Sequence, residues 1–339
     1  MPFIEELLTY GTISIVGLEK NTGKTECLNY ILKRVPFDKK VGVSSIGIDG
    51  EYKDQVTFGS KPEIFLREGM LFTTSEKHYK ERQIVSEIID LSSESTALGR
   101  LVTARALSNG KVLLSGPSTT NSLKRWISLL KDRFSTEICI IDGALSRLTL
   151  ASPAVSEAMI LATGASLSLD IKEIATKTAF TVEMINLPET SFKTKNKLIE
   201  VDTGIWLIDN DGRLIGNSLG TSFSAGYHQP DSIDTASAIY VSGAITDRFL
   251  NSLSLKTNNK IKEVIIKDFT KMFAGAHTYR NFLRRGGRLS VLSKSKLVAI
   301  TINPQSSNGT ILDSNKMYDE IKNLIDIPVF DIFKDGYKV

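Results

Sequence analysis

Hydrophobic and polar positions along the chain predict strands that alternate with helices. Short apolar runs recur nearly to the end of the sequence, and we predict a strand at each: Ile13–Val16, Val41–Ile46, Lys111–Leu114, Ile138–Ile141, Ile205–Ile208, Ala238–Val241, Glu263–Ile266, Leu297–Ile302 and Pro328–Ile332. After the first run, Leu28, Ile31, Leu32 and Val35 have the spacing of one helix face, and Pro36 ends that helix. Similar spacing predicts helices over 83–92, 95–108, 120–133, 152–167 and 171–182. This alternation predicts an α/β fold with a mostly parallel sheet and helices on both faces.

One segment departs from the alternation. Residues 188–226 are largely polar, but they contain IWLIDNDGRLIG at 205–216, where Asn210, Asp211 and Gly212 separate two apolar runs. Because asparagine and glycine accept a positive φ, this pattern predicts a β-hairpin. We therefore expect three parts: a core over 1–187, an inserted β-hairpin segment over 188–226, and a continuation of the α/β sheet over 227–339.

The first predicted strand runs into GLEKNTGKT, residues 17–25, and then into the predicted helix. Phosphate oxygens need backbone N–H groups, a helix N-terminus and a cation held together, and glycines let the backbone approach closely. We expect Lys24 to reach the terminal phosphates and the Thr25 hydroxyl to ligate Mg²⁺. Residues 1–187 are then a P-loop nucleotide-binding core. The candidate nucleotide-binding residues of the loop are Gly17, Lys20, Asn21, Thr22, Gly23, Lys24, Thr25 and Glu26.

The loop is one residue longer than the usual pattern, because five residues separate Gly17 from Gly23. Leu18 occupies the first loop position, where glycine is usual but not required. Lys20 either adds charge across a dimer or faces solvent. An ordinary glycine-containing turn between a strand and a helix is the alternative to a nucleotide site.

Two aspartates are candidates for the second anchor of the metal. Asp142 follows the apolar run at 138–141, and its alternative role is to cap a helix. Asp49 follows the second strand in IGIDGEYKD, and its alternative is a turn residue before Gly50. The candidate catalytic residues are therefore Lys24, Asp142 and Asp49, and the candidate Mg²⁺ ligands are Thr25, Asp142 and Asp49.

Two further loops follow predicted strands, where open α/β sheets bind ligands. In VLLSGPSTTN, Ser115, Gly116 and Ser118 either contact a substrate or partner or form a plain turn. In LVAITINPQS, the amide of Asn303 is a candidate reader of an adenine edge. The guanine-reading NKxD motif is absent from the sequence, which favours ATP over GTP.

Composition excludes several classes of protein. A net charge of +4 over 339 residues is too slight to indicate a nucleic-acid or membrane-surface partner. No apolar run approaches the roughly 18 residues that span a bilayer, and the acidic N-terminus is unlike a secretion signal, so we expect a cytoplasmic protein. Cys27 and Cys139 give neither zinc spacing nor a disulfide framework, and the histidines form no metal-binding pair.

The loop spacing resembles that of dethiobiotin synthetase and its relatives, in which glycine and five residues precede Gly-Lys-Thr. Related MinD-like proteins carry a signature lysine where this chain has Glu19, with Lys20 displaced by one position. The Thr-Asp-Thr of dethiobiotin synthetase is replaced by residues 18–20, Leu-Glu-Lys, so its substrate chemistry does not carry over. The resemblance implies a P-loop NTPase and, by analogy, a homodimer.

A second resemblance covers much of the chain. The segments VGLEKNTGKTECLNYIL, IGIDGEYKD, KPEIFLREGMLFTTSEK, LLSGPSTTNSL and IIDGALSRLTLASPAVSEAMILATGASLS look like those of a reactivating factor of D-lysine 5,6-aminomutase, an adenosylcobalamin enzyme of lysine fermentation. The resemblance implies an ATPase subunit of a chaperone that exchanges damaged cobalamin, with a MutS-like second subunit and the cobalamin-dependent aminomutase as partners. The chain lacks the DxHxxG signature of cobalamin-binding domains, so the cobalamin would belong to the client.

Two other functions stay open. A small-molecule ligase or kinase like dethiobiotin synthetase would use cations to orient an acceptor, and the candidates are Lys77, Arg100, Arg105 and Arg147. A scaffold with a degenerate loop is the third reading. The basic stretch at 274–296 is either a docking face or a solvated helix end, and its Gly286-Gly287 marks a helix stop.

Overall fold

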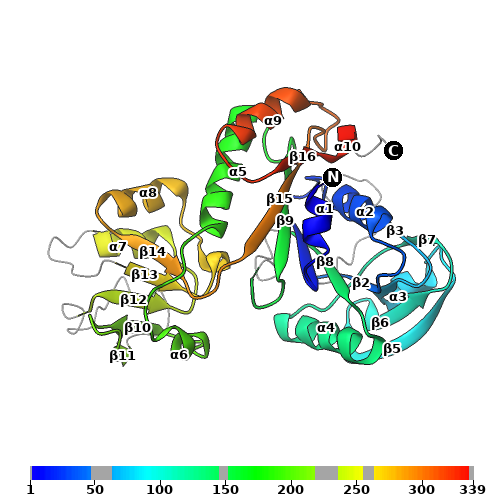
Figure 1. The fold of residues 1–339 in the computed structure, drawn as a ribbon, viewed down its shortest axis with the longest axis horizontal. Helices are drawn as coiled ribbons and strands as arrows, with labels where there is room; N and C mark the ends of the chain where they lie inside the picture. Colours follow the sequence, from blue (N-terminus) through cyan, green and yellow to red (C-terminus); the bar gives the residue numbers. More distant parts are fainter. Residues whose placement is uncertain (1, 47–62, 145–151, 218–235, 255–262, 336–339) are drawn as a thin grey trace. The chain divides into compact units, whose positions relative to one another are not determined.

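The computed structural model describes residues 2–46, 63–144, 152–217, 236–254 and 263–335. The chain forms two compact units (Figure 1). Unit 1 combines Met1–Ala179 with Lys296–Val339, and unit 2 is Phe180–Ser295. Each unit has its own sheet, so each is described by itself.

Unit 1 is built on a nine-stranded sheet with the order β16-β15-β9-β1-β8-β2-β4-β6-β5. Neighbouring strands from β16 to β4 are parallel, and β6 and β5 form an antiparallel edge. The strands are β1 (Thr12–Gly17), β2 (Val41–Ser45), β4 (Leu71–Ser75), β5 (Ser86–Thr96), β6 (Gly99–Ala106), β8 (Ile138–Ala144), β9 (Ala158–Gly164), β15 (Lys296–Asn303) and β16 (Val329–Asp331). Strands β3 (Ile64–Leu66) and β7 (Gly110–Val112) pair separately as a small antiparallel sheet.

Helices cover both faces of the parallel part of this sheet, as predicted. They are α1 (Pro2–Leu7), α2 (Lys24–Arg34), α3 (Glu76–Lys80), α4 (Thr120–Phe134), α5 (Ile171–Ile185), α9 (Ser314–Lys322) and α10 (Ile332–Asp335). Successive residues of β8 point to opposite faces. Ile140 therefore packs in one buried cluster with Leu28 and Ile31 of α2, whereas Ile141 packs in another with Leu130 of α4. The predicted apolar stripe of α2 is confirmed.

Unit 2 has a five-stranded sheet with the order β11-β10-β12-β13-β14. Its strands are β10 (Ile205–Ile208), β11 (Leu214–Asn217), β12 (Ala238–Val241), β13 (Glu263–Ile266) and β14 (Arg288–Val291), and its helices are α6 (Lys195–Ile199), α7 (Asp247–Ser254), the 3₁₀ turn η3 (Phe269–Lys271) and α8 (Ala276–Arg284). The predicted hairpin is confirmed: β10 and β11 are antiparallel, and Gly212 between them has φ +79°. Gly286, with φ +84°, follows the end of α8 as expected.

The division of the chain differs from the expected one. The hairpin of residues 188–226 does not join the main sheet, because β10 pairs with β12, and β12, β13 and β14 form a second parallel sheet. The chain returns to the nine-stranded sheet only at Lys296. Hydrophobic periodicity reports the type of an element and not its partner, so one sheet and two sheets give the same pattern.

Three predicted helices are wrong. Residues 83–92 and 95–108 contain strands β5 and β6, and 152–167 contains strand β9. β5 has irregular register at two places, between Ile88 and Asp90 and again between Leu91 and Ser95, and these shifts break the two-residue alternation of a strand. β9 is buried at every position, so it shows no alternation at all. The predicted strand at 111–114 is confirmed only as far as Val112, in the small sheet.

Among the described residues, no helix is long and apolar enough to cross a membrane.

Candidate nucleotide site

The loop between β1 and α2 has the backbone conformation that its sequence suggests. Asn21 has φ 60°, and Gly23, which precedes the first residue of α2, has φ 90°. Glycine and asparagine tolerate these left-handed conformations at little cost. The loop therefore turns sharply twice within three residues before it enters the helix.

Gly17 lies where a larger residue has no room. A Cβ atom at this position would lie 2.4 Å from the Thr22 hydroxyl oxygen and 2.9 Å from Cγ and Cδ of Lys24. The aliphatic part of Lys24 thus crosses directly over Gly17, and its Nζ donates to the Glu19 carbonyl at 3.4 Å. The Thr22 hydroxyl donates to the same carbonyl at 3.0 Å. Lys24 is folded back over the loop, with its ammonium group at the Glu19 carbonyl.

The start of α2 carries no side-chain cap. Gly23 is the N-cap residue and makes no side-chain hydrogen bond, and Lys24 is the first helical residue. The N–H groups of a first helical turn have no partner within the helix, and the helix dipole gives this end a partial positive charge. An uncapped N-terminus next to a lysine suits an anion such as a phosphate.

Asp142 lies beside this loop on the neighbouring strand. β8 pairs with β1, with Asp142 opposite Ile15, and with β2, with Asp142 opposite Ser45. Asp142 also affects Cys27, in the first turn of α2. The pKa of the Cys27 thiol is raised to about 12, mainly by burial; a hydrogen bond with Thr301 lowers this pKa, and the Asp142 charge raises it. Asp142 and Thr25 are both half-buried.

The other predicted residues differ in position. Lys20 and Glu26 are exposed, and Asp49 falls outside the described residues. The Asn303 amide, the candidate reader of an adenine edge, makes two hydrogen bonds: its Nδ2 donates to the Asn21 carbonyl at 3.1 Å, and its Oδ1 accepts from the Gln305 N–H at 3.0 Å. The structure therefore places the Asn303 amide against the loop between β1 and α2.

Sequence reasoning missed Ser166, which follows β9. Its hydroxyl donates to the Asn21 carbonyl at 3.0 Å, across 145 positions of sequence. Only the strand order β15-β9-β1 brings it to the loop. A polar residue just after a strand was the one local signal, and it is too common to be selective.

The loop after residue 114 packs against the sheet. Ser115 is buried, and its hydroxyl lies 3.0 Å from Nδ1 of the buried His78. A Cβ atom on Gly116 would lie 1.6 Å from the Ser45 carbonyl oxygen, so this glycine permits close contact with the end of β2. Ser115 and Gly116 hold the loop in place, and Ser118 is exposed.

Two of the four cations expected for an acceptor site, Arg100 and Arg105, are ion-paired on the edge of the sheet. Arg100 pairs with Glu76 at 3.2 Å, and Arg105 pairs with Glu87 at 2.9 Å, all with exposed side chains. Arg147 falls outside the described residues. Across the part of the chain that the structure describes, no group of three or more His, Cys, Asp or Glu residues could hold a metal ion.

No protein-family model matches the chain, and no curated protein or solved structure matches it either. The loop geometry is therefore the main basis for a functional inference.

Proposed function

We propose that unit 1 binds ATP with Mg²⁺ and hydrolyses the terminal phosphoanhydride bond. The observation that carries the proposal is Lys24 folded across Gly17, beside the left-handed Asn21 and Gly23 and an uncapped helix start. This arrangement combines a cation, backbone amides and a helix dipole at one point, and phosphoryl transfer depends mainly on such positioning and charge stabilisation.

The residues have distinct roles in this proposal. Lys24 neutralises charge on the terminal phosphates, and the Thr25 hydroxyl and Asp142 hold Mg²⁺ directly or through water. Mg²⁺ needs few protein ligands, because phosphate oxygens and water complete its shell. Asp49 is the candidate that orients the attacking water. The absence of NKxD from the sequence favours adenine as the base.

We further propose that hydrolysis drives the reactivation of a cobalamin-dependent aminomutase, with a MutS-like second subunit as partner. The support is the resemblance of the segments around the loop to the aminomutase reactivating factors. Hydrolysis of a bound nucleotide suits a switch, in which loops around the γ-phosphate change and a partner detects the change. The ligase alternative gains no support from Arg100 and Arg105, because both are ion-paired on the edge hairpin.

An activity assay tests both parts. ATP hydrolysis is measured for the chain alone, with the MutS-like subunit, and with an aminomutase whose cobalamin has been inactivated. We expect the partners to stimulate hydrolysis, and ATP, Mg²⁺ and fresh adenosylcobalamin to restore aminomutase activity. The K24A variant should abolish both effects. Rapid phosphorylation or ligation of a small metabolite without any partner would overturn the chaperone proposal.

A further inference from the structure

One backbone carbonyl in the phosphate loop accepts two side-chain hydrogen bonds from distant parts of the chain. The Asn21 carbonyl oxygen accepts from the Ser166 hydroxyl at 3.0 Å and from Asn303 Nδ2 at 3.1 Å. Asn21 is also one of two non-glycine residues with positive φ in the described part of the chain. Two donors thus hold the carbonyl of a residue in the left-handed conformation.

We propose that Ser166 and Asn303 are positioning residues of the nucleotide site, which together clamp the loop in its phosphate-binding conformation. The inference rests on the proposed binding of ATP. In a trans peptide the C=O and the following N–H point in opposite directions. Fixing the Asn21 carbonyl toward the two donors therefore fixes the Thr22 N–H on the other side of the peptide. A loop that already has this conformation avoids the ordering cost when phosphate binds.

Asn303 is itself firmly held. Besides the contact of its Oδ1 with the Gln305 N–H, its own carbonyl accepts from the Ala165 N–H at 2.9 Å. A Cβ atom on Gly164 would lie 2.0 Å from that carbonyl oxygen, so β9 and β15 approach closely here because residue 164 is glycine. A Cβ atom on Gly23 would lie 3.1 Å from the Asn303 Cβ. Asn303 therefore hydrogen-bonds Asn21 and lies close to Gly23.

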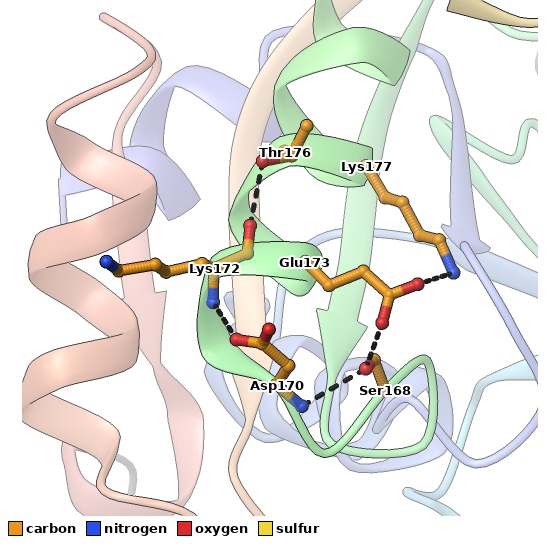
Figure 2. Close-up of polar contacts among 6 residues, drawn as sticks. All are labelled: Ser168, Asp170, Lys172, Glu173, Thr176 and Lys177. Carbon is orange, nitrogen blue, oxygen red and sulfur yellow. Dashed lines mark hydrogen bonds and ion pairs between the residues drawn. The ribbon is translucent and has the colours of Figure 1, made fainter.

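Helix α5 follows Ser166 in the sequence, and Figure 2 shows the side-chain contacts at its start. The Lys172 N–H donates to Asp170 at 2.9 Å, and Glu173 accepts from the Ser168 hydroxyl at 2.5 Å and pairs with Lys177 at 2.7 Å. These contacts lower the pKa of Glu173, first through Lys177 and then through Ser168. They hold the start of α5, and none of the contacts drawn in Figure 2 involves Ser166 or the loop.

Asn303 lies at the end of β15 and Ser166 lies just before α5, and these two elements are next to the points where the chain passes between the units. α5 begins shortly after Ser166 and runs across the boundary between Ala179 and Phe180. β15 begins at Lys296, the first residue after unit 2, and ends at Asn303. The clamp therefore ties the conformation of the phosphate loop to both connections that lead to unit 2.

The test compares binding of Mg²⁺-ATP and of inorganic tripolyphosphate, which has no base, by titration calorimetry. The variants are Ser166→Ala, Asn303→Leu and the conservative Ser166→Thr, and Ser168→Ala is the matched control because its hydroxyl bonds Glu173 and not the loop. We expect Ser166→Ala and Asn303→Leu each to weaken both ligands about 5- to 10-fold, the effect of losing one hydrogen bond. Ser166→Thr and Ser168→Ala should bind like the unaltered chain.

Each other outcome overturns part of the account. If the unaltered chain binds neither ligand, the proposed function fails and the clamp fails with it. If the unaltered chain binds but Ser166→Ala and Asn303→Leu match the control, the clamp alone is wrong. If Asn303→Leu weakens ATP but not tripolyphosphate, Asn303 reads the base instead. Hydrogen exchange tests the connection: ATP should slow exchange at Lys172–Lys177 in the unaltered chain and not in Ser166→Ala, and equal slowing in both would overturn that link.

Discussion

Two connections in this protein have the same order of elements but begin their helices with side chains of opposite charge. In unit 1, β1 leads through a loop to α2, and in unit 2, β12 leads through a loop to α7. The first residue of α2 is Lys24, whereas the first residue of α7 is Asp247, whose carboxylate accepts from the Gly275 N–H at 2.9 Å. A carboxylate at a helix N-terminus competes with a phosphate for the same partial charge. The partial positive charge at the start of α7 is therefore already balanced by a carboxylate of the protein itself.

The backbones of the two loops differ as well. In unit 2, the Ile245 N–H donates to the Lys271 carbonyl at 2.7 Å, and the Phe273 N–H donates to the Ile245 carbonyl at 2.8 Å. A Cβ atom on Gly243 would meet nothing within 4 Å, whereas one on Gly17 would collide with Thr22 and Lys24. The two connections share a strand, a loop and a helix, but they differ in the crowded glycine and the folded-back lysine of the β1–α2 loop. The proposed phosphate site rests on these two features.

The largest expected effect is on catalysis through Lys24. We expect Lys24→Ala to lower the ATP hydrolysis rate by about 100- to 1,000-fold, because the variant removes the cation that stabilises developing phosphate charge. Lys33→Ala is the matched control, since Lys33 is an exposed lysine on the same helix. A steady-state phosphate-release assay checks the pair. Equal rates for the two variants would show that Lys24 has no special role in hydrolysis, and the α2 connection would then not differ from the α7 connection in function.

The next effect concerns the metal. Asp142→Asn should weaken activation by Mg²⁺ by roughly 10- to 100-fold, as is typical when a group that orients or holds a metal is neutralised. Asp132→Asn on α4 is an exposed control. Mg²⁺ titrations of ATP hydrolysis measure the shift. If Asp142→Asn keeps the Mg²⁺ dependence of the control, Asp142 has the capping or structural role instead.

Nucleotide should stabilise unit 1 and leave unit 2 unchanged. The chain has two tryptophans, Trp126 in α4 of unit 1 and Trp206 in β10 of unit 2. Fluorescence of Trp206→Phe therefore reports on unit 1, and that of Trp126→Phe reports on unit 2. At 100 times the dissociation constant, Mg²⁺-ATP should raise the free energy of unfolding of unit 1 by about 2.7 kcal/mol. Stabilisation of unit 2 alone would mean that the nucleotide binds to unit 2, which contradicts a site in unit 1.

The smallest effect is a pH dependence of stability. Burial raises the pKa of Cys27 to about 12, from about 8.5 in an unfolded chain. Above about pH 8.5 the unfolded state loses the thiol proton while the folded state keeps it, so this contribution to stability is complete below that pH and declines toward pH 12. Urea unfolding measures the free energy of unfolding of the unaltered chain and of Cys27→Ala. The difference between the two should be smaller at pH 10 than at pH 8 by about 1–2 kcal/mol. A constant difference would contradict the burial of this thiol beside the site.

The sequence predicted what depends on neighbours along the chain. Gly17, Gly23 and Lys24 lie within one short segment, so the loop and the stripe of α2 could be recognised locally. The contacts of Ser166 and Asn303 with Asn21 could not, because they depend on which strands pair, and no local pattern specifies that. The separate sheet of unit 2 was missed for the same reason. β5 was missed because its irregular register disrupts the alternation that identifies a strand.

Binding of ATP to a pair of glycine variants tests the central claim most directly. Gly17→Ala adds a methyl group where Thr22 and Lys24 leave no space, and Gly243→Ala adds the same group where the space is open. Equilibrium titration with Mg²⁺-ATP should show that the unaltered chain and Gly243→Ala bind one nucleotide per chain with equal affinity, and that Gly17→Ala binds at least about 100-fold more weakly, the loss of roughly 2.7 kcal/mol. Equal binding by all three proteins, or loss of binding in Gly243→Ala and not in Gly17→Ala, would contradict a nucleotide site at the β1–α2 loop.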